Sequence, residues 1–110
     1  MSQTIILIHC SCKDVQEAQT IASALIEQRL AGCATISSPV LSVYRWQQQV
    51  ESEPEVLLQI KSTQQNFARV EAAILSLHSY DVPEIIATEI SACSKDYREW
   101  LIQSCQPEPE

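Results

Sequence analysis

Residues 33–61 read CATISSPVLSVYRWQQQVESEPEVLLQIK, and this stretch decides the fold. Its two extended segments, 33–46 and 50–61, flank three consecutive glutamines, as strands flank the turn of a hairpin. In the second segment, apolar residues alternate with mixed ones, and the wholly apolar face carries Val56, Leu58 and Ile60. The first segment contains Pro39, which cannot donate to a strand ladder and is expected at an edge position or a bulge. The sequence therefore predicts a long antiparallel hairpin.

This hairpin is longer than the helix expected beside it. Residues 33–46 would span roughly 46 Å at ~3.3 Å per extended residue, whereas a helix over 15–31 covers about 25 Å. The outer part of the hairpin is rich in apolar side chains, namely Leu41, Val43, Tyr44, Trp46 and Val50. Self-association would remove this surface from water and would cover exposed strand edges. The alternative is that the hairpin curls back over the open sheet face of its own subunit.

The spacing of apolar residues predicts the elements around the hairpin. The β-branched run at 4–8 is typical of a strand, and apolar residues recur at three- and four-residue steps over the helix 15–31. A second helix follows Thr63, residues 84–90 have strand composition, and Ser94 precedes a final short helix. The order βαββαβ with an added C-terminal helix indicates an α+β, ferredoxin-like sandwich, in which two helices cover one face of an antiparallel sheet.

The length of the chain suits one domain. Its 110 residues support a single core, which we expect over residues 1–105, with a flexible Pro/Glu tail over 106–110. The one glycine, Gly32, follows the first helix at a place where a left-handed residue commonly ends a helix. A single glycine also excludes the glycine-rich loops that cradle phosphates, because those loops need several.

Charge and hydropathy exclude further classes of partner. The formal net charge is −7 and no run of Lys or Arg breaks it, so we expect no nucleic-acid partner. No apolar stretch approaches the ~18 residues of a membrane span, and the start lacks a secretion signal, so we expect no membrane partner and a cytoplasmic location. The five cysteines are odd in number and scattered, which favours reduced thiols over a disulfide framework.

Two short segments carry candidate metal ligands. Cys10 and Cys12 would point to the same face of an extended strand, where thiolates suit copper or zinc, although the pair could equally be ordinary buried residues. His78, Tyr80 and Glu84 lie in the turn after the second helix with nitrogen and oxygen donors, but such turns are often simply solvated. The spacing in this turn matches no defined metal motif.

A third group could line a cleft, with Lys61 as a cationic anchor and Tyr97 and Trp100 beside it. The alternatives are a lysine lying along a strand edge and ordinary aromatic packing. The two histidines belong to no Ser/His/Asp or Cys/His arrangement, so we expect no enzyme activity.

Taken in order, several stretches resemble the CutA divalent-cation-tolerance family across roughly residues 5–102. The resemblance is carried by Ala-Gly-Cys-Ala-Thr-Ile at 31–36, Ser-Val-Tyr-Arg-Trp at 42–46, the strand at 55–61, His-Ser-Tyr-Asp-Val-Pro-Glu-Ile-Ile at 78–86 and Asp-Tyr-Arg-Glu-Trp-Leu at 96–101. It implies a ferredoxin-like subunit in a tight homotrimer, similar to the PII-type signalling trimers, with a role in tolerance of copper and other divalent metals.

Carried over residue by residue, the resemblance implies that Cys10, His78 and Glu84 are metal ligands. Bacterial members often read His-His-Pro-Tyr where this chain has Leu77-His78-Ser79-Tyr80, so one potential imidazole is absent. The leading hypothesis is a trimer that binds copper or zinc and needs no organic cofactor. The alternative is a PII-like signalling trimer that binds a small molecule in an intersubunit cleft formed by Lys61, Tyr80, Tyr97 and Trp100.

Overall fold

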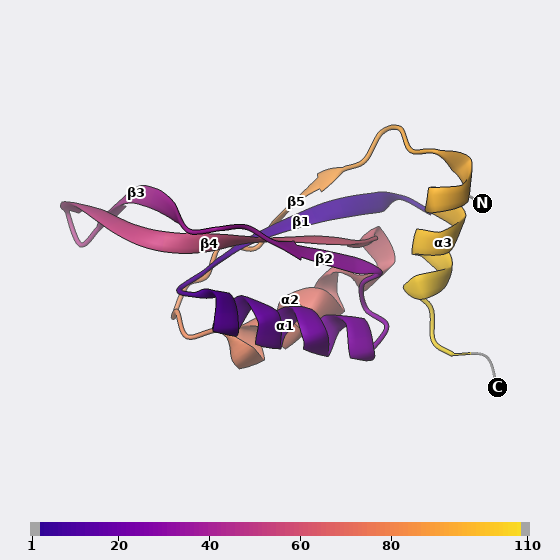
Figure 1. Cartoon of the computed structure of the whole chain (residues 1–110), viewed down its shortest axis with the longest axis horizontal. Helices are drawn as coiled ribbons and strands as arrows, with labels where there is room; N and C mark the ends of the chain where they lie inside the picture. The colour runs from indigo at the N-terminus through magenta and orange to yellow at the C-terminus, as the bar shows by residue number, and fades with distance from the viewer. Residues whose placement is uncertain (1–2, 109–110) are drawn as a thin grey trace.

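The computed structural model describes residues 3–108 as a sheet with two helices on one face and a third at one end (Figure 1). In chain order the elements are β1 (Ile5–Cys12), α1 (Val15–Glu27), β2 (Cys33–Ile36), β3 (Val40–Trp46), β4 (Gln49–Thr63), a 3-10 turn (Gln64–Asn66), α2 (Phe67–Leu77), β5 (Ile86–Glu89) and α3 (Lys95–Ser104). The strands run in the order β2-β4-β1-β5, β3 also pairs with β4, and every pairing is antiparallel. The predicted α+β, ferredoxin-like fold is confirmed.

The core lies between the sheet and its two covering helices. α1 begins where the Asp14 carboxylate accepts a hydrogen bond from the Glu17 N–H at 2.8 Å, and the apolar stripe of the helix then faces the sheet. β4 contributes Val56, Leu58 and Ile60, as its alternation predicts. The second helix, α2, contributes Val70 and Ile74 to the same core. The largest fully buried side chains include Ile8, Ile21, Leu25, Leu58, Ile60, Val70 and Ile74.

The hairpin formed by β3 and the first half of β4 projects beyond the helices (Figure 1). It gives the subunit a long axis of 49 Å against 28 and 23 Å in the other directions. Leu41, Val43 and Val50 are 68%, 65% and 69% exposed, so the hairpin does not curl back over its own subunit. We call β3 together with residues 49–55 the arm, and the rest of the sheet with its helices the body.

Residues 33–46 form two strands rather than one. Ile36 pairs with Leu58 and Val40 pairs with Glu55, so three residues on one strand face two on the other. This arrangement is a one-residue bulge, and Pro39 lies within it, as its missing N–H requires. The bulge lies where the arm leaves the body.

The end of α1 corrects two predictions. The helix stops at Glu27 instead of continuing to residue 31, because Arg29 adopts a left-handed φ of 57°. The guanidinium of Arg29 then donates to the Gln103 carbonyl at 2.9 Å. Gly32 has no positive φ, so its role is not to end the helix. A Cβ at Gly32 would lie 2.7 Å from the Cδ1 of the buried Leu101, so this glycine permits close packing of α3.

α3 closes the end of the sheet opposite the arm. Leu101 and Cys105 form a small second cluster with Ile5 from the first strand. The final strand is shorter than the predicted range 84–90, and none of its four residues is buried. The predicted tail over 106–110 lies partly outside the described residues, because 109 and 110 are not described, and its flexibility stays a prediction.

None of the helices in the described range has the length and apolar composition of a membrane span.

Candidate metal centre

β1 brings two cysteines to the covered face of the sheet. The strand stays extended as far as Cys12, which pairs with Val56, so Cys10 and Cys12 point the same way. Both are buried beneath the helices, with exposed fractions of 1% and 0%. The condition for convergence of the two thiols, an extended strand end, is therefore met.

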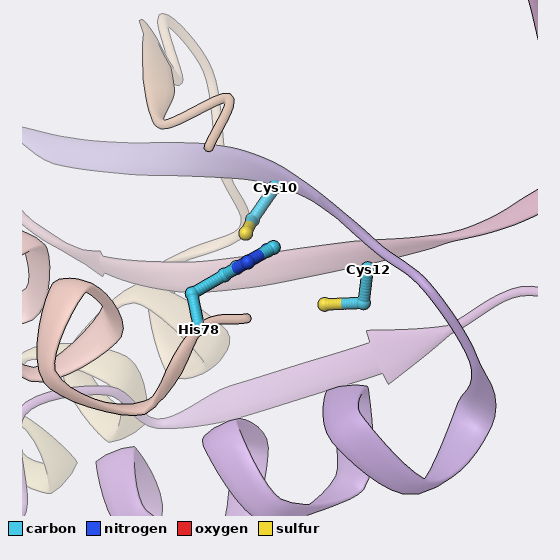
Figure 2. A group of neighbouring side chains, drawn as sticks. All are labelled: Cys10, Cys12 and His78. Atoms are coloured by element: carbon cyan, nitrogen blue, oxygen red, sulfur yellow. The ribbon is translucent and has the colours of Figure 1, made fainter. Parts of the chain in front are cut away.

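His78 joins them from the end of α2. Its backbone N–H still bonds to the Ile74 carbonyl at 2.8 Å, while its backbone has already left the helical conformation. Figure 2 shows the imidazole pointing towards the side chains of Cys10 and Cys12. One donor atom from each of the three residues lies within 4.8 Å of the other two. We call this group the Cys2His cluster.

The hydrogen bonds of His78 assign its tautomer. Nδ1 accepts from the Tyr80 N–H at 3.1 Å, so Nε2 carries the proton and donates to the Ser11 carbonyl at 2.8 Å. Both ring nitrogens are therefore hydrogen-bonded to backbone groups. An ion that uses this imidazole must replace one of these bonds, at a cost of about 0.5–1.5 kcal/mol.

Glu17 holds the turn that carries His78. Its carboxylate accepts hydrogen bonds from the Lys13 N–H at 3.1 Å and the Ser79 N–H at 2.9 Å, and it lies 3.9 Å from the imidazole of His78. Burial alone would raise the pKa of Glu17, but the hydrogen bonds from Ser79 and Lys13 and the nearby imidazole together lower it. Glu17 thus stays ionised and ties the start of α1 to the turn after α2.

The Cys10 thiol of the cluster is protonated at neutral pH. The neighbouring Cys12 side chain, followed by burial, raises the pKa of Cys10 well above its usual range. Binding of a cation must therefore displace protons from sulfur. Two sulfurs and one imidazole nitrogen are a donor set that suits copper(I) and zinc and suits magnesium or calcium poorly.

Glu84, the third ligand implied by the sequence resemblance, lies outside this cluster. Its Oε1 accepts a hydrogen bond from the Ser11 hydroxyl at 3.1 Å, and its side chain is exposed. Ser11 alternates with the two cysteines along β1 and so faces the other side of the strand. The structure brings together Cys10 and His78 from the set that the resemblance implies, and it adds Cys12, which the two-residue spacing along the strand had already indicated as a candidate ligand.

The four predicted cleft residues lie in two places within one chain. Lys61 Nζ lies 3.5 Å from the Tyr97 hydroxyl, and the Tyr97 ring lies 5.3 Å from the ring of Trp100. Tyr80 instead donates to Glu55 Oε2 at 2.6 Å. Glu55 and Lys61 are six residues apart along β4, or about 20 Å. A cleft that contains all four would need a second copy of the chain.

Comparisons with known proteins agree with the fold. Residues 6–104 match the family described as CutA1 divalent ion tolerance protein. The chain is 39% identical to the divalent-cation tolerance protein CutA of Thermus thermophilus, over 90% of this chain and 94% of that one. It is 33% identical to the chloroplastic protein CutA of Arabidopsis thaliana, over 90% of this chain but only 54% of the longer relative.

The backbone is also similar to that of solved CutA1 proteins. The crystal structure of CutA1 from Oryza sativa superposes with a TM-score of 0.93 at 29% identity, and the match covers 97% of this chain and 98% of that one. Sequence, backbone and the extent of the match therefore lead to one conclusion: this chain belongs to the CutA1 divalent ion tolerance family.

Proposed function

We propose that the protein contributes to metal tolerance by binding copper, or zinc in its place, and that it does so as a cytoplasmic homotrimer without catalysing a reaction. The observation that carries the proposal is the meeting of Cys10 with His78, two ligand types that soft and borderline metals prefer. Family membership supports the same role, since the relatives are named for tolerance of divalent cations.

The arm supports self-association. Leu41, Val43 and Val50 lie on one face of the arm, because residues 41, 43 and 45 pair with 54, 52 and 50. This apolar face has no cover among the described residues of a single chain. Contiguous exposed apolar surface of this kind usually marks an interface, and strands with free edges invite pairing with other copies. The resemblance to the CutA family implies three copies.

Calorimetric titration of the reduced full-length protein with copper(I) or zinc, without oxygen, tests the metal-binding proposal. We expect saturable binding that weakens at least tenfold in Cys10→Ala and in His78→Ala. Cys33→Ala is the matched control, because this thiol lies outside the cluster. Absence of saturable binding, or equal binding by all variants, would contradict the proposal. Thermal stabilisation by a metabolite without metal would instead favour small-molecule binding.

A further inference from the structure

We propose that Cys12 is a direct metal ligand, so that Cys10 and Cys12 together bind the ion as a pair of thiolates in the Cys2His cluster. This inference rests on the proposed function, since it concerns the ion that the same cluster binds. It differs from the resemblance, which implies Cys10, His78 and Glu84. The two sites also differ in chemistry, because the Cys2His cluster offers two sulfur ligands, whereas the set implied by the resemblance offers one.

The spacing of the donor atoms carries the first step. Metal–thiolate bonds to zinc are ~2.3 Å long, so two sulfurs on one ion lie at most about 4.6 Å apart. The donor atoms of the cluster already lie within 4.8 Å of one another, and both cysteines come from one rigid, paired strand. Rotation about the Cα–Cβ bonds of Cys10 and Cys12 is the motion that would place both sulfurs on a common ion.

The carboxylate and the imidazole near the two thiols are each held by hydrogen bonds. The Glu84 carboxylate accepts from the Ser11 hydroxyl on the other side of β1 and is not among the converging donor atoms. His78 must give up a backbone hydrogen bond before it can bind. By contrast, Cys10 Sγ makes a long and weak contact of 3.9 Å with the Ser11 carbonyl, so little is lost when that sulfur turns to a metal.

The chemical class of the ion follows from the ligands. Two thiolates select the soft copper(I) ion and the borderline zinc ion over magnesium, calcium or manganese, which prefer oxygen. Each thiol gives its proton to solvent as its sulfur binds, so the two negative charges formed are balanced by zinc and half balanced by copper(I). Burial of the cysteines keeps water from competing for the ion.

X-ray absorption of the full-length protein loaded with zinc, and separately with copper(I), counts the sulfur ligands. We expect two sulfur neighbours at about 2.3 Å in the unaltered protein. Cys12→Ala should show one sulfur neighbour and bind zinc at least tenfold more weakly. Glu84→Gln and Cys33→Ala are the controls, and both should keep two sulfurs and the original affinity. Circular dichroism establishes that each variant is folded.

The outcomes separate this inference from the function on which it rests. A single sulfur neighbour in the unaltered protein would overturn the role of Cys12 and leave metal binding in place. The same holds if Glu84→Gln loses affinity and Cys12→Ala does not. A protein that binds neither ion would overturn the proposed function itself. Because the sulfur count of the unaltered protein needs no substitution, a Cys12 variant that fails to fold would not hide the answer.

Discussion

The two halves of β4 both carry apolar side chains, but these lie in opposite surroundings. In the body, Val56, Leu58 and Ile60 are 2%, 0% and 0% exposed beneath the helices, whereas Val50 in the arm is 69% exposed. The difference comes from the length of β4, because this strand extends beyond the ends of the two helices that cover the body (Figure 1). An alternating apolar strand therefore indicates a surface that must be covered, and only the neighbouring elements decide whether its own chain covers it.

The arm also differs from the body in having two distinct exposed faces. Val43 is directly opposite Ser52 on the apolar face, and Tyr44 is opposite Glu51 on the other face. Glu53 lies on the same side as Glu51, and so does Trp46, so this second face combines acidic and aromatic side chains. The contrast predicts that substitutions on the apolar face of the arm affect assembly, while substitutions in the body affect folding.

The largest effect is expected in the body. Leu58→Ala removes a fully buried side chain from the centre of the core and should lower the free energy of unfolding by about 2–5 kcal/mol. Urea unfolding at a fixed protein concentration measures this change, because association adds to apparent stability. Gln59→Ala, at the exposed neighbouring position, is the control and should change stability by less than about 0.5 kcal/mol. A loss below about 1 kcal/mol in Leu58→Ala would contradict the assignment of the core.

A smaller effect of a different kind is expected in the arm. Val43→Asp places a charge on the apolar face and should cost assembly about 1.5–3 kcal/mol per subunit, which raises the dissociation concentration at least tenfold. Sedimentation velocity over a dilution series measures assembly, and circular dichroism should show that the subunit stays folded. Glu53→Gln on the second face of the arm serves as control. If Val43→Asp unfolds the chain without releasing folded monomer, the distinction between arm and body is wrong.

The smallest effect concerns the turn that joins the body to the metal cluster. Glu17→Gln weakens two hydrogen bonds from backbone N–H groups and should lower stability by about 1 kcal/mol at pH 7. The pKa of Glu17 is lowered by folding, so its contribution is complete above its ordinary value near 4.5 and is lost as the pH falls through the folded value. Thermal unfolding from pH 7 to pH 3.5 should show the two proteins converge at acid pH. A difference in stability that stays constant with pH would indicate that packing, and not the charge of Glu17, causes the loss.

Much of the fold could be predicted from local patterns. The alternation of apolar residues over 56–60 is nearly enough to predict a strand, and their three- and four-residue spacing in α1 is nearly enough to predict a helix. The order of these strands and helices along the chain then predicts the ferredoxin-like plan. The end of α1 could not be predicted, because it depends on the contact of Arg29 with the Gln103 carbonyl from the far end of the chain. For the same reason the predicted role of Gly32 is wrong, because its close contact is with α3.

The candidate site was only partly predictable. The spacing of Cys10 and Cys12 could place both on one face of a strand, and the resemblance supplied His78. That His78 meets both thiols depends on where α2 ends, a tertiary feature that spacing does not encode. The side of β1 on which Glu84 lies depends on its contact with Ser11, 73 residues earlier in the chain.

The mass of the unmodified protein in solution tests most directly whether sister copies cover the arm. Light scattering across micromolar concentrations should give three times the 12.3 kDa subunit mass, about 37 kDa, with no trend on dilution. A stable 12.3 kDa species over the same range would contradict the account, because the apolar face of the arm would then stay in water.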